Sequence, residues 1–292
     1  MVSPFIPGSY LTIEEYRAAP TALATNTLVP GGTQEDQDNE LAGLIKRASR
    51  YLDNTARQTL AATQATQRER VRIDGQGNFV LHAHQDRVKS VDAFAWGFSP
   101  TSLAAMETPI PPSQYFIEEN RILVARSSAG GLSWVGGLNF IAEPSGGTVY
   151  ASWTYTAGWV TTRLAAGATA GDTSVIVEDP TGIGPGAFIQ LIDGANQTSV
   201  QVAASYTLGS ATVPLAAALA EDMPAGAGFT EVPEDIKEAC VLATSHYIKM
   251  RKAGGFVMSG TSATVDQTTE TQLGPELEQA RQLALRYERI TP

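Results

Sequence analysis

The chain has 292 residues, of which 43% are hydrophobic and 17% charged, and its formal net charge is −10 at pH 7. This length predicts one large domain or two smaller ones, with enough apolar residues for a real core. The negative charge argues against general affinity for nucleic acid or anionic membranes, and we expect no basic stripe. The single cysteine, Cys240, excludes an internal disulfide and falls at an apolar helix position typical of a buried thiol.

The N-terminal residues show no basic segment followed by an apolar run, so we expect no signal peptide. No stretch approaches the roughly 18 apolar residues of a membrane span. These patterns predict synthesis in a cytoplasm and no membrane partner.

Two helices are expected in the first third of the chain. Thr12, followed by Glu15, fits the capping box of a short helix that ends at Pro20. A much longer helix is expected from Glu35 to about Ala62, because acidic residues fill its first turn and apolar residues recur at helical spacing. At about seven turns it exceeds the usual globular helix, which is typical of a bundle or an interface.

Strands are expected over residues 66–73, 79–84, 87–96, 115–117, 122–124 and 148–156, where apolar residues alternate with polar ones. Residues 74–77, Asp-Gly-Gln-Gly, fit a hairpin turn.

Residues 162–231 form a distinct β module in the sequence. Short strand-like runs at 174–177, 187–192, 199–203 and 211–215 alternate with turns rich in glycine, proline and aspartate, and lysine is absent. Such an insertion requires two ends that meet at a surface, so we expect a projecting lobe suited to contact with neighbours. Four or five short strands predict a small barrel or sandwich.

Two further helices are expected near the C-terminus, one opening at Pro233 and ended by Gly254 and Gly255, the other opening at Pro275. Residues 259–272 between them have too few apolar side chains to order themselves. We expect this segment to be mobile in a free subunit or to gain order by lying on a partner.

No catalytic motif emerges from the sequence: it has no nucleophile elbow, phosphate loop or His-Glu-x-x-His. We therefore expect no enzymatic activity and no cofactor. The glycines at 182, 184 and 186 do not open a helix, so they do not fit a nucleotide site. His82, His84 and Asp86 share one face of an expected strand, but two histidines without a reliable third ligand favour a polar sheet face over a metal site.

The four tryptophans leave one alternative open, because they fit a carbohydrate platform as well as sheet core positions. They are Trp96, Trp134, Trp153 and Trp159.

Several segments carry a resemblance to a known family. They are Tyr10–Tyr16 with Ala19-Pro20-Thr21, the run from Leu41 to Asp53, Tyr155-Thr156-Ala157-Gly158-Trp159, and Pro233–Ala239. Together with a glycine-rich break and a last helix ending near Tyr287, they resemble the head–tail adaptor (connector) proteins of long-tailed double-stranded DNA bacteriophages. The β module departs from the short form of that family and resembles small β modules of assorted phage virion proteins.

The resemblance implies a structural virion protein in the neck. It implies a homo-oligomeric ring of twelve subunits, docked between the portal protein and the next head-closure or tail protein. Double-stranded DNA would pass through its lumen without specific binding, and an acidic lumen would repel the phosphates. The alternatives are another phage tail or baseplate protein, or an extracellular carbohydrate-binding module.

This interpretation predicts two sets of contact residues. The candidate ring interface on the long helix comprises Leu41, Leu44, Ile45, Arg47, Arg50 and Arg57. Candidate portal-docking residues, in the 255–274 segment and the last helix, are Phe256, Val257, Met258, Val265, Leu285 and Arg289.

The expected fold class is α+β: a helical adaptor core of three main helices, a β-sheet region, and an inserted small all-β barrel or sandwich domain. The expected domains are 1–161 and 232–292 for the adaptor core and 162–231 for the inserted β domain.

Overall fold

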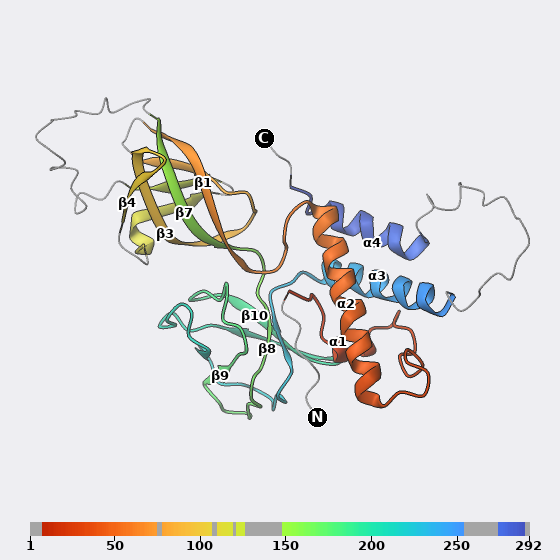
Figure 1. Ribbon diagram of the computed structural model, residues 1–292. Coiled ribbons are helices and arrows are strands. Elements are labelled where there is room, and N and C mark those ends of the chain that lie inside the picture. The colour runs from red at the N-terminus through yellow and green to blue at the C-terminus, as the bar shows by residue number, and fades with distance from the viewer. Residues whose placement is uncertain are drawn as a thin grey trace, which may run out of the picture. The chain divides into compact units, whose positions relative to one another are not determined.

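The chain divides into two compact units (Figure 1). The computed structural model describes residues 8–74, 78–106, 110–118, 121–125, 148–253 and 274–289. Unit 1 comprises Met1–Ala61 and Trp159–Pro292, and unit 2 comprises Ala62–Gly158. Among the described helices, none combines the length and hydropathy needed to cross a membrane.

The fold is mostly β, so the prediction of a core built on three main helices is wrong. Strands take 35% of the described residues and helices 27%, and the largest feature is a curled antiparallel sheet. The sequence patterns predicted shorter strands for this sheet, because the strands extend beyond the residues where apolar and polar side chains alternate most clearly. The first begins at Thr63 rather than at residue 66, and the third runs to Ser99 rather than to residue 96.

Unit 2 is a seven-stranded antiparallel sheet in the order β4-β3-β7-β1-β2-β6-β5. Figure 1 shows β1, β3 and β7 running side by side. A 3-10 helix, η1, at Pro112–Gln114 precedes β5. The strands are β1 Thr63–Ile73, β2 Phe79–His82, β3 Val88–Ser99, β4 Ser102–Ala105, β5 Tyr115–Glu118, β6 Arg121–Val124 and β7 Thr148–Ala157.

The sheet encloses its own hydrophobic cluster on one face. Trp153 is 1% exposed and stacks on Tyr155 with ring centroids 4.4 Å apart. Phe79 contacts Phe94 and Trp96, each at 5.0 Å between centroids. The expected hairpin between residues 115 and 124 is confirmed by the β5–β6 pairing, whereas β4 was not foreseen. The expected turn residues Gly75, Gln76 and Gly77 lie outside the described residues.

Unit 1 contains the four described α-helices: α1 Ile13–Ala18, α2 Gln34–Ala56, α3 Glu234–Ala253 and α4 Pro275–Leu285. The expected capping box of Thr12 and Glu15 is confirmed, and α2 begins with a second one. That helix ends well before Ala62, because Arg57 adopts a left-handed conformation with φ 55°. Its own amide then bonds back to the last turn.

Helices α2, α3 and α4 pack against one another, as Figure 1 shows. One hydrophobic cluster joins them to the N-terminal segment and to Trp159. Apolar side chains on the inner face of α2 and on α3 are almost fully buried there, whereas the opposite face of α2 carries the exposed arginines. The amphipathic pattern thus predicted which face of α2 is buried.

The rest of unit 1 consists of short strands with a separate hydrophobic cluster drawn from residues between Val160 and Phe229. The four strand positions expected within 174–215 are occupied by strands, and β8 and β13 add to them. One sheet has the order β11-β10-β13-β8, and β12 pairs with β9. The bounds are β8 Thr161–Arg163, β9 Ser174–Ile176, β10 Phe188–Asp193, β11 Asn196–Gln201, β12 Thr212–Pro214 and β13 Gly228–Thr230.

Candidate functional site

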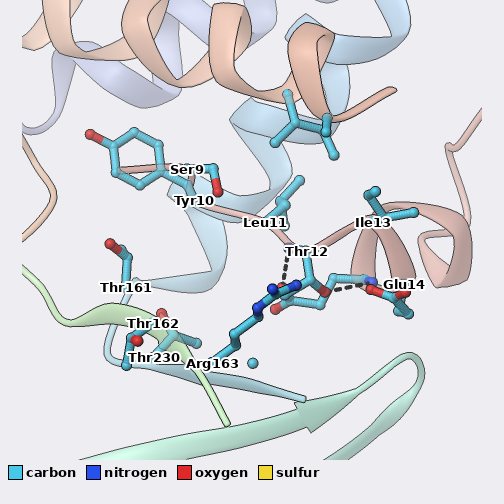
Figure 2. Close-up of a pocket in the computed structure, with 14 residues that line it drawn as sticks. Ser9, Tyr10, Leu11, Thr12, Ile13, Glu14, Thr161, Thr162, Arg163 and Thr230 are labelled. Carbon is cyan, nitrogen blue, oxygen red and sulfur yellow. Dashed lines mark hydrogen bonds between the residues drawn. The ribbon is translucent and has the colours of Figure 1, made fainter. Parts of the chain in front are cut away.

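The strands of unit 1 meet its helices at a small cavity of about 40 Å³. Its walls come from residues 9–15, from Ala42 and Ile45 of α2, and from β8 and β13. In Figure 2, Arg163 reaches up from β8 toward Thr12, and dashed lines mark the capping bonds between Thr12 and Glu15. Since one water needs at least about 10–15 Å³, this space admits a few waters and no substrate.

A buried ion pair lies beside this junction. Lys237 Nζ on α3 is 3.3 Å from Glu15 Oε1 on α1, and the two side chains are only 7% and 8% exposed. Neither atom has a partner in hydrogen-bond geometry, although the other oxygen of Glu15 accepts a bond from the Thr12 amide at 2.6 Å. Because removal from water is costly for both charges, each compensates the other for its lost solvation, and Glu234 Oε1 lies 3.8 Å from the same Lys237 Nζ. The pair therefore ties the N-terminal segment to α3.

A second cavity of about 330 Å³ adjoins the same ion pair. It is lined by α1 and the turn after it, by the β10–β11 hairpin, and by the first turns of α3, including Glu234, Glu238 and Val241. Its volume reaches the lower end of the roughly 300–1,000 Å³ typical of ligand pockets. The lining contains no histidine or cysteine, and its lysine, Lys237, is paired with Glu15.

A second buried polar cluster secures the N-terminal segment to the end of α2. The Tyr10 hydroxyl donates to Asp53 Oδ1 and accepts bonds from the amides of Leu60 and Ala61 at 3.2 and 3.3 Å. Burial, followed by the charge of Asp53, raises the pKa of Tyr10 well above its usual value. Burial also raises the pKa of Asp53. The side chains of Tyr10 and Asp53 thus accept hydrogen bonds from buried backbone amides, which is a structural role.

Cys240 is the fully buried thiol that the sequence indicated. Its sulfur lies 3.6 Å from the Ser49 hydroxyl, and burial raises its pKa to about 12. A thiol that is protonated at neutral pH and closed to solvent does not act as a nucleophile.

The six candidate ring residues divide between the two faces of α2. Leu41, Leu44 and Ile45 lie in the hydrophobic cluster of unit 1 and are at most 7% exposed, so they contact their own chain. The reason is that the apolar stripe of α2, predicted to contact a neighbouring subunit, packs on α3 and α4 of the same chain. The other three, all arginines, are exposed.

The three exposed arginines of α2 make different contacts. The Arg47 guanidinium lies 4.4 Å from the ring centroid of Tyr247, and Arg57 pairs with Glu288 at 3.1 Å. Arg50 forms no ion pair with any residue in the described ranges. Ring contact through α2, if it occurs, must therefore use this polar face.

Two of the six candidate docking residues are described. Leu285 and Arg289 are half-buried at the end of α4, and the Arg289 amide donates to the Ala56 carbonyl at 3.0 Å. Phe256, Val257, Met258 and Val265 lie outside the described residues, as do Gly254 and Gly255.

The structure separates the histidines that the sequence placed on one strand. Strand β2 ends at His82, so His84 and Asp86 follow in the loop. Within the described ranges, no group of three or more histidine, cysteine or acidic side chains is arranged to hold a metal ion. Gly182, Gly184 and Gly186 precede strand β10 and no helix.

Two of the four tryptophans are core residues. Trp153 is 1% and Trp159 4% exposed, and they belong to different units. Trp96 is half-buried against Phe79, and Trp134 lies outside the described residues. The described tryptophans therefore form no exposed platform for a sugar.

The expectation that the protein has no basic stripe is wrong. Arg68, Arg70 and Arg72 alternate along β1, are all exposed, and thus line one face of the sheet. Arg121 on β6 is also exposed, and the register places it two strands away on that face. The negative net charge of the chain gave no indication of this arrangement. The sequence Arg-Glu-Arg-Val-Arg at residues 68–72, with arginine at every second position of an expected strand, does predict it. We call these four residues the arginine row.

Searches against models of known protein families and against curated proteins found no match to this chain.

Proposed function

We propose that this protein is a structural subunit of the neck of a long-tailed bacteriophage, where it forms a homo-oligomeric ring between the portal and the tail. The observation that supports this most directly is that most segments carrying the resemblance pack together, although Tyr155 and Ala157 belong to the hydrophobic cluster of unit 2. Residues from Tyr10–Tyr16, Leu41–Leu52, Trp159 and Ile236–Ala239 all contribute to one hydrophobic cluster, with Tyr287 packed against it. Patterns scattered over the sequence thus form one structural framework.

The interior of that framework is consistent with a scaffold. Its buried polar groups are engaged in holding segments together: Glu15 with Lys237, and Tyr10 with Asp53. The proposal assigns ring contacts to the exposed face of α2 and portal contacts to the end of α4, with twelve copies closing by repeated front-to-back contacts. Double-stranded DNA passes through the lumen.

The test is imaging of the assembled protein. Purified full-length chain, alone and mixed with isolated portal rings, is examined by mass photometry and negative-stain electron microscopy. A closed ring, or a collar that appears only on the portal, supports the proposal. If the chain neither forms rings nor binds portal rings, and intact virions show no density for it at the neck, the proposal fails.

A further inference from the structure

The arginine row of unit 2 has the geometry of a site for a linear anion. Successive side chains on one face of a strand are about 6.6–6.8 Å apart, so Arg68, Arg70 and Arg72 span roughly 13 Å. All three are exposed on β1, and Arg121 lies at the side of this line on β6. Four guanidinium groups are thereby held by a rigid sheet.

The strand beside the row supplies a hydroxyl opposite each arginine of β1. In the register of β1 with β7, Arg68 faces Ser152, Arg70 faces Tyr150, and Arg72 faces Thr148. The Arg70 guanidinium also lies 5.3 Å from the ring centroid of Tyr150. Guanidinium and hydroxyl groups are among the side-chain groups that bond to phosphate oxygens.

Within the described ranges no ion pair neutralises the three arginines of β1, whereas Arg121 lies directly opposite Glu118 on the same face in the β5–β6 register. Glu69, the only acid on β1, points to the other face, where it accepts a hydrogen bond from the Trp153 indole at 3.0 Å. None of the four arginines forms an ion pair within the described part of the chain. In unit 1, by contrast, several exposed arginines are paired with carboxylates, such as Arg57 with Glu288, Arg251 with Glu40, and Arg286 with Asp235.

We infer that the arginine row binds the phosphodiester backbone of DNA. A regular line of cations fits a ligand whose charges also recur at fixed intervals, and each DNA strand carries one phosphate per roughly 3.4 Å of helix axis. The described acidic residues of unit 1, which an adjacent copy would offer instead, are dispersed over helix first turns and loops, such as Glu35, Glu234 and Asp172. Periodicity therefore favours nucleic acid over a second copy.

The binding is weak and independent of sequence. A chain of net charge −10 repels DNA at long range, so only close contacts with the row bind it. The dissociation constant lies in the range of about 10⁻⁴–10⁻⁶ M typical of non-specific binding, or is larger than that range. This inference goes beyond the proposed function and does not require a ring, although a ring would repeat the row and raise the avidity.

The test measures binding of full-length protein to labelled DNA by fluorescence anisotropy from 20 to 150 mM salt. A 30-base-pair duplex and a 30-nucleotide single strand serve as probes, because both carry the same phosphate chemistry. We expect binding at low salt. The logarithm of the binding constant should fall linearly with the logarithm of the salt concentration, with a slope of about 0.9 per contacted phosphate for the duplex and about 0.7 for the single strand. The variant Arg68→Gln, Arg70→Gln, Arg72→Gln weakens binding roughly tenfold at 150 mM salt and by more at lower salt, because it lowers the slope by about 3 for duplex.

Two variants serve as controls. Arg50→Gln, Arg281→Gln, Arg286→Gln removes the same charge from exposed helical positions of unit 1 and retains the slope. Arg68→Lys, Arg70→Lys, Arg72→Lys keeps the charge and most of the binding. Circular dichroism verifies that each variant is folded.

Three results overturn the inference: no binding by the wild type at 20 mM salt, equal losses in both glutamine variants, or a row variant that binds DNA normally but no longer self-associates. The last result would assign the row to contacts between copies. If the DNA-binding inference fails, the proposal of a ring on the portal still stands. If no rings form, the DNA-binding measurement is still valid.

Discussion

The two units of this protein use charge in opposite ways. Unit 1 carries 13 basic and 22 acidic residues, whereas unit 2 carries 7 and 8 and is almost neutral. Yet the described exposed arginines of unit 1 are largely paired, and the nearly neutral sheet presents three arginines on β1 that form no ion pair with any described residue. Net charge thus describes neither surface, because secondary structure decides which charges share a face.

The cores of the two units also differ. Unit 2 depends on large aromatic side chains enclosed by a sheet, such as Phe79 and Trp153. Unit 1 combines two hydrophobic clusters with buried polar connections between distant segments. Substitutions in one core should therefore have consequences distinct from those in the other, and four experiments examine this.

The largest expected effect is on unit 2. Trp153→Ala removes a fully buried side chain and leaves Glu69 without its indole partner, and we expect a loss of about 3–5 kcal/mol. Differential scanning calorimetry should show one transition shifted downward while a second, from unit 1, stays in place. A single transition that moves as a whole would mean that the units unfold together.

In unit 1, Lys237→Met leaves the Glu15 carboxylate buried without its counter-ion. We expect a loss of about 3 kcal/mol, because a single buried charge costs more than an intact pair. Urea unfolding measures it. The double variant Glu15→Gln, Lys237→Met should recover part of this loss, and additive losses would show that the two side chains are not coupled.

Tyr10→Phe tests the second polar connection. It removes the hydroxyl that donates to Asp53 and accepts from the Leu60 and Ala61 amides, and we expect a loss of about 1–3 kcal/mol. Urea unfolding again provides the measurement. Tyr51→Phe, at a half-buried position of α2, is the matched control. An equal loss of unfolding free energy in that variant would show that the hydrogen bonds of Tyr10 are not the cause of the effect.

The smallest effect concerns reactivity rather than stability. With a pKa of about 12, raised by burial, the Cys240 thiol stays protonated as pH rises from 7 to 9. Native protein should therefore react negligibly with a thiol reagent over this range and completely in 6 M urea. In Lys237→Met, labelling should be faster because unit 1 opens more often. Fast labelling of native wild type would show that the cluster around Cys240 is open.

Local chemistry made several elements predictable from the residues alone. Thr12 and Glu15 identified the start of α1, Pro275 that of α4, and helical periodicity the buried face of α2. These signals involve neighbours within a few residues, so they act in any context. The same periodicity could not tell whether the buried face meets its own chain or another subunit.

Sequence alone determined which residues are apolar, which cap a helix, and that three arginines alternate along one strand. Tertiary structure decided that the sheet exceeds the helices, that Leu41, Leu44 and Ile45 are internal, and that Lys237 meets Glu15 across 222 positions. It also decided that Glu69 turns to Trp153 and away from the arginines on the other face of β1. The reason is that pairing between distant strands and helices depends on the packing of the whole chain, which no local window of residues contains.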